Sequence, residues 1–213
     1  MKTDDLVALL ARSAGPVDSA ASSRQFARTL ASGALLSLVA VLLFLGPRPD
    51  WRSAMDVPMF WIKLGFPAAT AAAAFIVLRR LAYPGMKVGW TMFGPLVPVA
   101  IVWAMAATVL LAARPADRLP LILGSSSWQC PSFIAALSLP AFLLALRGLR
   151  RLAPTRLALT GAVAGLFAGG AAAFAYALYC IEMQAPFLGV WYVLGMSIPA
   201  AAGALLGRRL LHW

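Results

Sequence analysis

Long apolar stretches alternate with short polar connections along most of the chain. A membrane-spanning helix needs about 20 apolar residues to cross a hydrocarbon core of about 30 Å. Stretches of this length that lack acidic and basic residues, apart from Lys63 in the second, cover residues 29–47, 57–78, 88–113, 119–146, 157–181 and 183–207. The pattern predicts an all-α, polytopic integral membrane protein, a bundle of six transmembrane helices with short loops. Only the start of the fourth stretch, Gly124-Ser125-Ser126-Ser127, has the composition of a loop.

The overall composition supports this class. Hydrophobic residues make up 62% of the 213 residues and charged residues 12%, about half the charged share of a soluble domain. A soluble protein of this length could not cover so much apolar surface, and a β-barrel would show short alternating segments instead of long apolar runs. Two Cys and one His exclude a disulfide scaffold and a His-rich metal enzyme.

Basic residues are unevenly distributed between the two sets of connections. Thirteen Lys and Arg lie in the N-terminal segment, the second and fourth connections and the C-terminus, and five lie on the other side. The positive-inside rule then places both termini in the cytoplasm, with the chain crossing the membrane several times. This rule also accounts for most of the net charge of +11, so no nucleic-acid partner is needed to explain it. The predicted domains are a cytoplasmic segment, residues 1–28, and a transmembrane domain, residues 29–213.

The N-terminal segment begins like a short amphipathic helix. Thr3 can cap it, and Asp4 and Asp5 fall in the first turn, where the helix dipole favours acidic residues. Leu6, Leu9 and Leu10 share one face. This face could dock on the membrane or on the bundle itself. Because acidic residues disfavour an anionic membrane surface, we favour a protein partner with a groove, contacted through residues 2–6, which include Lys2, and through Leu9 and Leu10.

Motifs of enzymes are missing from the chain. No pair of carboxylates lies inside a predicted span, and there is no phosphate-binding loop or nucleophile elbow. The single histidine, His212, is the penultimate residue. Lys63 is the only charged residue within a predicted span, and its position near the outer end predicts that it snorkels to the headgroups. We therefore expect no catalysis and no cofactor.

Small residues form a strip along the fifth predicted span. Gly161, Gly165 and Gly169 are spaced by four residues, which lets the backbone of a neighbouring helix approach closely. Cys180 lies 11 residues after Gly169, a rotation of about 1100°, which places it within about 20° of the same face. If the neighbouring helix is the fourth span, Cys180 could meet Cys130.

The two cysteines are the leading functional candidates. Cys130 precedes Pro131 at the start of the fourth span and Cys180 ends the fifth, so both are expected at the non-cytoplasmic face. A helix N-terminus lowers the pKa of a thiol, which predicts that Cys130 is the more reactive. The pair could form a disulfide, bind a soft metal transiently through both sulfurs, or be small buried side chains with a packing role only.

The order of these motifs resembles the NrsF family of membrane anti-sigma factors, which act on extracytoplasmic-function sigma factors in proteobacteria. The resemblance covers nearly the whole chain. It rests on the six spans, the opening residues 1–6, Cys130-Pro131 after a serine-rich loop, Cys180-Ile181-Glu182, Pro186-Phe187 and residues 191–196.

The resemblance implies a multi-pass protein of the bacterial inner membrane whose cytoplasmic side holds an extracytoplasmic-function sigma factor away from RNA polymerase. It also implies that Cys130 and Cys180 take part in sensing periplasmic stress, including oxidants and heavy metals. A membrane thiol oxidoreductase is an alternative, but such enzymes usually need a Cys-x-x-Cys pair, which the chain lacks. A small transporter is a second alternative, disfavoured by the shortage of charged residues inside the spans. The oligomeric state does not follow from the sequence.

Overall fold

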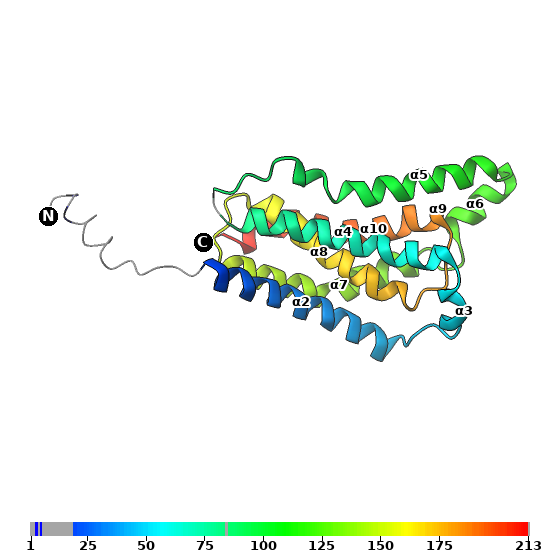
Figure 1. The fold of residues 1–213 in the computed structure, drawn as a ribbon, viewed down its shortest axis with the longest axis horizontal. Coiled ribbons are helices and arrows are strands. Elements are labelled where there is room, and N and C mark those ends of the chain that lie inside the picture. The colour runs from blue at the N-terminus through cyan, green and yellow to red at the C-terminus, as the bar shows by residue number, and fades with distance from the viewer. Residues whose placement is uncertain (1–2, 4, 6–18, 84, 213) are drawn as a thin grey trace.

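The structure is a computed structural model that describes residues 3, 5, 19–83 and 85–212. Within these residues all regular structure is helical, and the helices form one elongated bundle (Figure 1). Five segments are long and apolar enough to cross a membrane: Ser23–Phe44, Pro58–Ala82, Gln129–Arg150, Leu157–Ala177 and Ala185–Leu210. The first belongs to α2 (Ser19–Phe44), the next three are α4, α7 and α8, and the last comprises α9 (Ala185–Phe187), η2 (Leu188–Tyr192) and α10 (Val193–Leu210).

The third predicted span, residues 88–113, is shorter than expected. It divides into a 3₁₀ turn, η1 (Gly89–Phe93), and α5 (Leu96–Ala112), an apolar helix of 17 residues. Gly89 has a positive φ of 51°, and Pro95 immediately precedes α5, so the chain bends before the helix begins. Only Val102 and Ala106 of α5 are buried, and Figure 1 shows α5 along one side of the bundle.

Two further predicted boundaries also shift. The fourth stretch, residues 119–146, starts in a separate short helix, α6 (Pro115–Leu123), and the spanning helix α7 (Gln129–Arg150) follows the expected loop. Gly124 starts this loop with a φ of 55°, and a Cβ atom there would lie 2.6 Å from the ring of Phe187. At the N-terminal side, α2 begins at Ser19, ten residues before the predicted domain boundary.

Helix α8 (Leu157–Ala177) is the most deeply buried of the five long segments. Its glycine strip packs against α10: Gly161 faces Gly203, and a Cβ atom at Gly165 would overlap the backbone of Pro199 and Ala200. The close neighbour of the strip is therefore the sixth predicted span. Helix α8 also packs against α4 and α7, which brings these helices around it.

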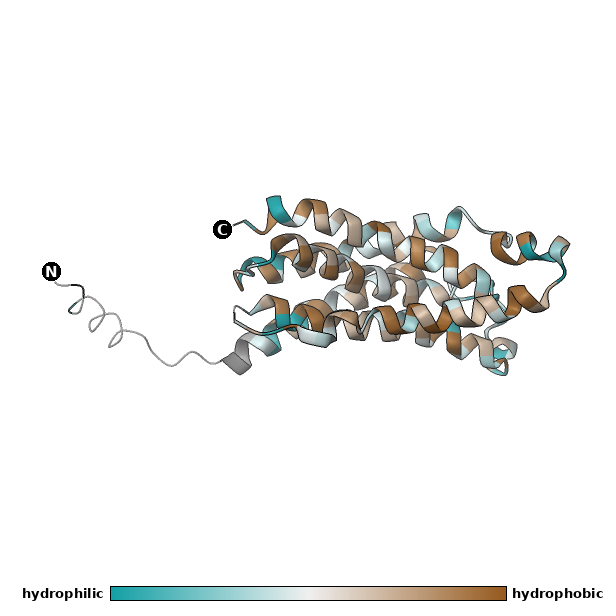
Figure 2. Cartoon of the chain, turned by 90° about the horizontal axis from the view of Figure 1, so that it is seen from above, coloured by the Kyte–Doolittle hydropathy of each residue, from teal (hydrophilic) through white to brown (hydrophobic). Residues whose placement is uncertain are grey.

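The bundle has two chemically different ends, and Figure 2 shows polar residues gathered towards both of them. Helix α2 begins and α10 ends at the same end (Figure 1). We call it the basic end because it carries Arg79, Arg80, Arg147, Arg150, Arg151, Arg156, Arg208 and Arg209. The opposite end, where α3 (Trp51–Met55), α6 and α9 lie, we call the thiol end because it contains both cysteines. Buried apolar side chains form one cluster towards each end, and the cluster of the thiol end includes Cys130 and Cys180.

Candidate functional site

Cys130 and Cys180 come together inside the thiol end. Both are free thiols, with exposed fractions of 0% and 4%. Cys130 is the second residue of α7, and Cys180 lies in the connection between α8 and α9. The two thiols belong to the same buried cluster, where the Cys130 side chain acts directly on the Cys180 thiol. The small-residue strip of α8 packs against α10 and not against the fourth span, so this is not the route by which the thiols approach. Helix α8 ends at Ala177, and Cys180 reaches the start of α7 from the turn that follows.

Cys130 lies at a helix N-terminus, as the sequence indicates, but its side chain is fully buried. Helix α7 begins at Gln129, with Trp128 in the N-cap position, and the backbone amide of Cys130 donates to the carbonyl of Ser126 at 3.1 Å. The charged groups of the site instead gather around Cys180. The hydrogen bond from Cys130, followed by the charge of Lys63, holds the pKa of the Cys180 thiol below its ordinary value.

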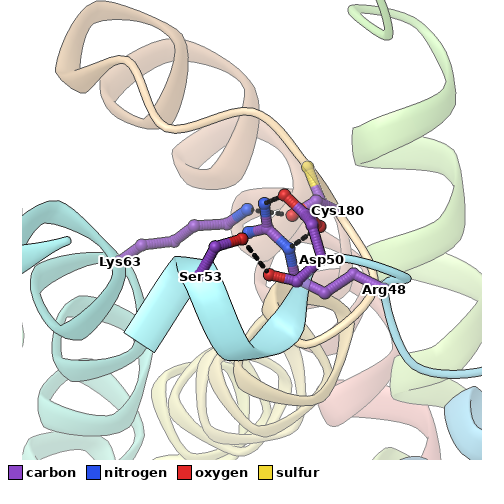
Figure 3. A network of polar contacts seen from close by, with 5 residues as sticks. All are labelled: Arg48, Asp50, Ser53, Lys63 and Cys180. Atoms are coloured by element: carbon purple, nitrogen blue, oxygen red, sulfur yellow. Dashed lines mark hydrogen bonds and ion pairs between the residues drawn. The ribbon is translucent and has the colours of Figure 1, made fainter. Parts of the chain in front are cut away.

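Lys63 points into the protein, so the prediction that it snorkels to the headgroups is wrong. Its side chain is fully buried, and its Nζ donates to the backbone carbonyl of Cys180 (Figure 3). The Nζ also lies 5.9 Å from the centre of the Tyr192 ring. Among the residues that the structure describes, Lys63 forms no ion pair with a carboxylate. The turn after α8 supplies a carbonyl within its reach, and this contact replaces water at the bundle surface.

Arg48 forms a second buried cationic group beside the thiols. Its Nε and Nη2 donate to both oxygens of Asp50, at 2.8 and 2.7 Å, and the hydroxyl of Ser53 donates to the Asp50 carbonyl (Figure 3). This ion pair raises the pKa of Arg48 and lowers that of Asp50. The backbone amide of Arg48 donates to the carbonyl of Leu178 at 3.2 Å. This bond joins the connection that follows α2 to the segment that carries Cys180.

Glu182 fastens the same segment to the loop before Cys130. One of its carboxylate oxygens accepts from the backbone amide of Ser125 at 2.7 Å and from the Ser125 hydroxyl at 2.5 Å. The indole of Trp191 donates to the carbonyl of Ile122 and contacts the ring of Trp128, 5.6 Å between centres. The segment that carries Cys180 is therefore held against the loop before α7, and η2 is held against the end of α6 and against Trp128.

A π-helical turn, η2, completes the site. It contains Tyr192, whose hydroxyl is buried next to Cys180 and has no well-aligned hydrogen-bond partner among the described residues. Tyr176 of α8 packs against the Tyr192 ring, 6.2 Å between centres. Single π-helical turns occur frequently at functional sites, because the extra residue redirects side chains that a regular α-helix would place elsewhere.

The sequence reasoning singled out both cysteines, which the structure brings together, but missed the residues around them. The signal for Lys63 was available, since a charged residue within a membrane span is by default a functional candidate. Within the described residues no group of three or more His, Cys, Asp or Glu side chains could hold a metal ion. In that part of the chain the thiols thus have no third ligand of these types beside them.

The predicted partner-binding segment falls mostly outside the described residues. Lys2, Asp4, Leu6, Leu9 and Leu10 belong to that undescribed part of the chain, whereas Thr3 and Asp5 are described and exposed. The docking role of this segment therefore stays a prediction.

Comparison with known proteins assigns the family. The model of the family NrsF, described as "Negative regulator of sigma F", matches residues 10–213. The chain belongs to the NrsF family. The probable anti-sigma-F factor NrsF of Azospira oryzae is 43% identical over 213 residues, and the anti-sigma-F factor NrsF of Caulobacter vibrioides is 36% identical over 219 residues. Both alignments cover 100% of this chain and 100% of the relative.

The NrsF family is regulatory by its description, which fits the expectation that the chain is not an enzyme. No solved structure matches the chain. The family assignment confirms the resemblance on which the functional expectations rest.

Proposed function

We propose that this NrsF protein is an inner-membrane anti-sigma factor that holds a sigma factor of the extracytoplasmic-function class and releases it when the Cys130–Cys180 pair is oxidised. The relatives named as anti-sigma-F factors match over their full lengths, which supports a sigma factor as the partner. The observation that carries the sensing half of the proposal is the contact between two free thiols at one end of the bundle.

The orientation follows from charge. Eight arginines gather at the basic end, and the positive-inside rule favours the cytoplasm for that end. The thiol end would then face the periplasm. Both the start of α2 and the end of α10 lie at the basic end, as expected for cytoplasmic termini. The predicted docking segment, residues 2–10, precedes α2 in the sequence.

The chemistry suits a reversible switch. Hydrogen peroxide can convert two thiols into one disulfide with release of two water molecules. A disulfide here would join the segment carrying Cys180 covalently to the first turn of α7. We propose oxidation and not metal capture as the signal, because the described residues supply no third ligand.

A continuous helix connects the two ends. Helix α2 runs from the basic end towards Arg48, whose backbone amide is bonded to Leu178 beside the thiol site. Along its length, α2 contacts α7 through Gly33, which faces Ala141, and through a 2.9 Å hydrogen bond from the Ser37 hydroxyl to the Leu137 carbonyl. Oxidation that moves α7 against the Cys180 segment would therefore shift α2 and the docking segment that precedes it. Such a signal works only if the partner binds the two states with different affinity.

A reporter strain tests both halves of the proposal. Native protein should repress a sigma-dependent reporter and release repression after peroxide is added. Cys130→Ser combined with Cys180→Ser should keep repression but lose the response. A full response of this double variant would contradict the sensing proposal.

Leu6→Ala with Leu10→Ala should derepress the reporter without any oxidant. Loss of a buried leucine anchor costs roughly 2 kcal/mol, about thirtyfold in affinity. Leu35→Ala with Leu43→Ala is the matched control, because both side chains are exposed on the membrane-spanning part of α2. Repression that survives deletion of residues 2–11 would contradict the docking proposal and leave the sensing proposal intact.

A further inference from the structure

We infer that Lys63 is a positioning residue that makes Cys180 the thiol that reacts first with an oxidant, with Cys130 as the resolving thiol. This inference deepens the proposed function, because it assigns an order to the two cysteines. It also reverses the order that the helix N-terminus suggested from the sequence.

A charged Lys63 buried in this way requires an anionic partner. An ammonium group taken out of water costs several kcal/mol unless a negative charge and hydrogen bonds compensate it. The backbone carbonyl of Cys180 supplies one hydrogen bond to Nζ, and the centre of the Tyr192 ring lies 5.9 Å away. Neither of these groups carries a full negative charge.

The nearby carboxylates are already engaged. Asp50, on the connection after α2, accepts both hydrogen bonds from Arg48, and Glu182, on the Cys180 segment, accepts from Ser125. The other titratable groups facing the site are Cys130 on α7, Cys180, Tyr176 on α8 and Tyr192 on η2. Tyrosine gives up its proton only near pH 10 in water, whereas a thiol does so near pH 8.5, so a thiolate is the accessible anion.

The geometry favours Cys180 over Cys130 as that thiolate. Lys63 bonds to the backbone of Cys180 itself, so its charge is fixed beside this residue. Arg48 also acts electrostatically on Cys180, and the Cys130 thiol is placed to donate a hydrogen bond to the Cys180 sulfur. Together these contacts hold the pKa of Cys180 below its ordinary value. Cys130 then reacts in the second step, as the resolving thiol.

The chemical steps balance with a peroxide as the oxidant. The Cys180 thiolate attacks one oxygen of hydrogen peroxide, the O–O bond breaks, and the products are a Cys180 sulfenic acid and hydroxide. The sulfur of Cys130 then attacks the sulfenic sulfur. A disulfide forms, the S–O bond breaks, and the sulfenic hydroxyl leaves as water with the proton of Cys130. Two thiols are oxidised and one peroxide is reduced.

The test measures sulfenic acid formation in the purified full-length protein in lipid nanodiscs. A Cys130→Ser variant keeps a hydrogen-bond donor at position 130 and has no resolving thiol, so dimedone can trap Cys180 after peroxide is added. Mass spectrometry then gives the rate of adduct formation at each pH. In this background Lys63→Met should slow trapping at pH 7 by about tenfold or more, the loss of thiolate expected if the pKa of Cys180 rises from about 6 to about 8 or above. It should also move the midpoint of the pH profile upwards.

Two further variants separate a charge effect from a loss of structure. Lys63→Arg keeps the positive charge and should retain most of the rate. Lys87→Met removes an exposed lysine at the other end of the bundle and should leave the rate unchanged. An unchanged rate and midpoint in Lys63→Met would overturn the inference.

The order of the thiols has its own readout, which needs no change at Lys63. In a Cys180→Ser variant, dimedone should trap Cys130 more slowly than it traps Cys180 in the Cys130→Ser variant. Equal rates, or a midpoint for Cys180 at the ordinary thiol value of about 8.5, would overturn the inference. These measurements concern chemistry alone. A reporter strain that ignores oxidant would defeat the proposed function while leaving these rates as they are.

Discussion

The buried charges of the thiol end are held by contacts of different strength. Arg48 has an exposed fraction of 4% and is paired with both oxygens of Asp50, but its Nη1 is buried and has no hydrogen-bond partner in the described part of the chain. Lys63 contacts a carbonyl and the face of a ring. A guanidinium group that loses its carboxylate while it stays buried is an uncompensated charge.

We therefore predict that Asp50→Asn destabilises the thiol end. The melting temperature of the purified protein, followed by circular dichroism in nanodiscs at neutral pH, should fall below that of native protein. Asp56→Asn changes an exposed carboxylate nearby and is the matched control. Equal losses in the two variants would contradict a special role for the Arg48–Asp50 pair.

The difference in melting temperature between native protein and Asp50→Asn should depend on pH, and the direction of the shift in the Asp50 pKa determines how. The native state lowers the pKa of Asp50 from its ordinary value of 3.8, so the carboxylate stabilises the fold above that value. This stabilisation is lost as the pH falls through the lowered pKa of the native state. The advantage of native protein over Asp50→Asn should thus be full at neutral pH and shrink only in strong acid.

The sequence identified the two cysteines of the site but not the direction of the Lys63 side chain. Cys130 and Cys180 were identifiable as a pair at one face of the membrane. Cys130 starts one span and Cys180 ends the next, and consecutive spans cross the membrane in opposite directions. The direction of the Lys63 side chain was not identifiable from the sequence. A lysine near the end of a span can reach either the headgroups or an interior carbonyl with the same four-carbon stem. Only the position of the Cys180 turn decides between these, and that turn depends on where α8 ends.

At the scale of elements, the small-residue strip of α8 sets how closely two helices approach. The four-residue spacing of Gly161, Gly165 and Gly169 indicated the close packing that the structure shows. The identity of the neighbour, α10, depends on how all the helices share one core, which the periodicity of a single helix does not encode. In contrast, α5 was overestimated in length because apolar residues preceding Pro95 continue the hydrophobic run without continuing the helix.

We predict that Gly165→Leu separates α8 from α10. A Cβ atom at Gly165 would lie 2.8 Å from the Cα of Ala200 and overlap the Pro199 backbone, so the helices must move apart. Overpacking of this kind costs about 3 kcal/mol. The melting temperature in nanodiscs should fall, and repression should weaken without oxidant if the bundle transmits the signal.

Gly65→Leu is the control for this substitution. Gly65 lies on α4 and is exposed, and a Cβ atom at this position would have no neighbouring atom within 4 Å. Leucine there should therefore leave stability and repression unchanged. If Gly165→Leu behaves like Gly65→Leu, the close approach of α8 and α10 does not determine either property.

In the whole molecule, the thiol site and the arginine-rich surface lie at opposite ends of the bundle axis. Both cysteines, Lys63 and Arg48 lie at the thiol end, whereas eight arginines and the start of α2 lie at the basic end. Helix α2 and the core helix α8 extend between these ends. An anti-sigma factor that responds to an external oxidant needs this separation, because the oxidant and the sigma factor are on opposite sides of the membrane. The alternating distribution of basic residues along the sequence already indicated it.

The proposed function requires that the oxidation state of the thiol pair controls the affinity for the sigma factor. It is tested most directly by the dissociation constant of the purified sigma factor for full-length protein in nanodiscs, reduced and then oxidised with peroxide. Oxidation should weaken binding by about tenfold or more, a change of about 1.4 kcal/mol. The Cys130→Ser, Cys180→Ser variant should bind equally well before and after peroxide treatment. Equal affinity of the reduced and disulfide-bonded native protein for the sigma factor would contradict release by oxidation.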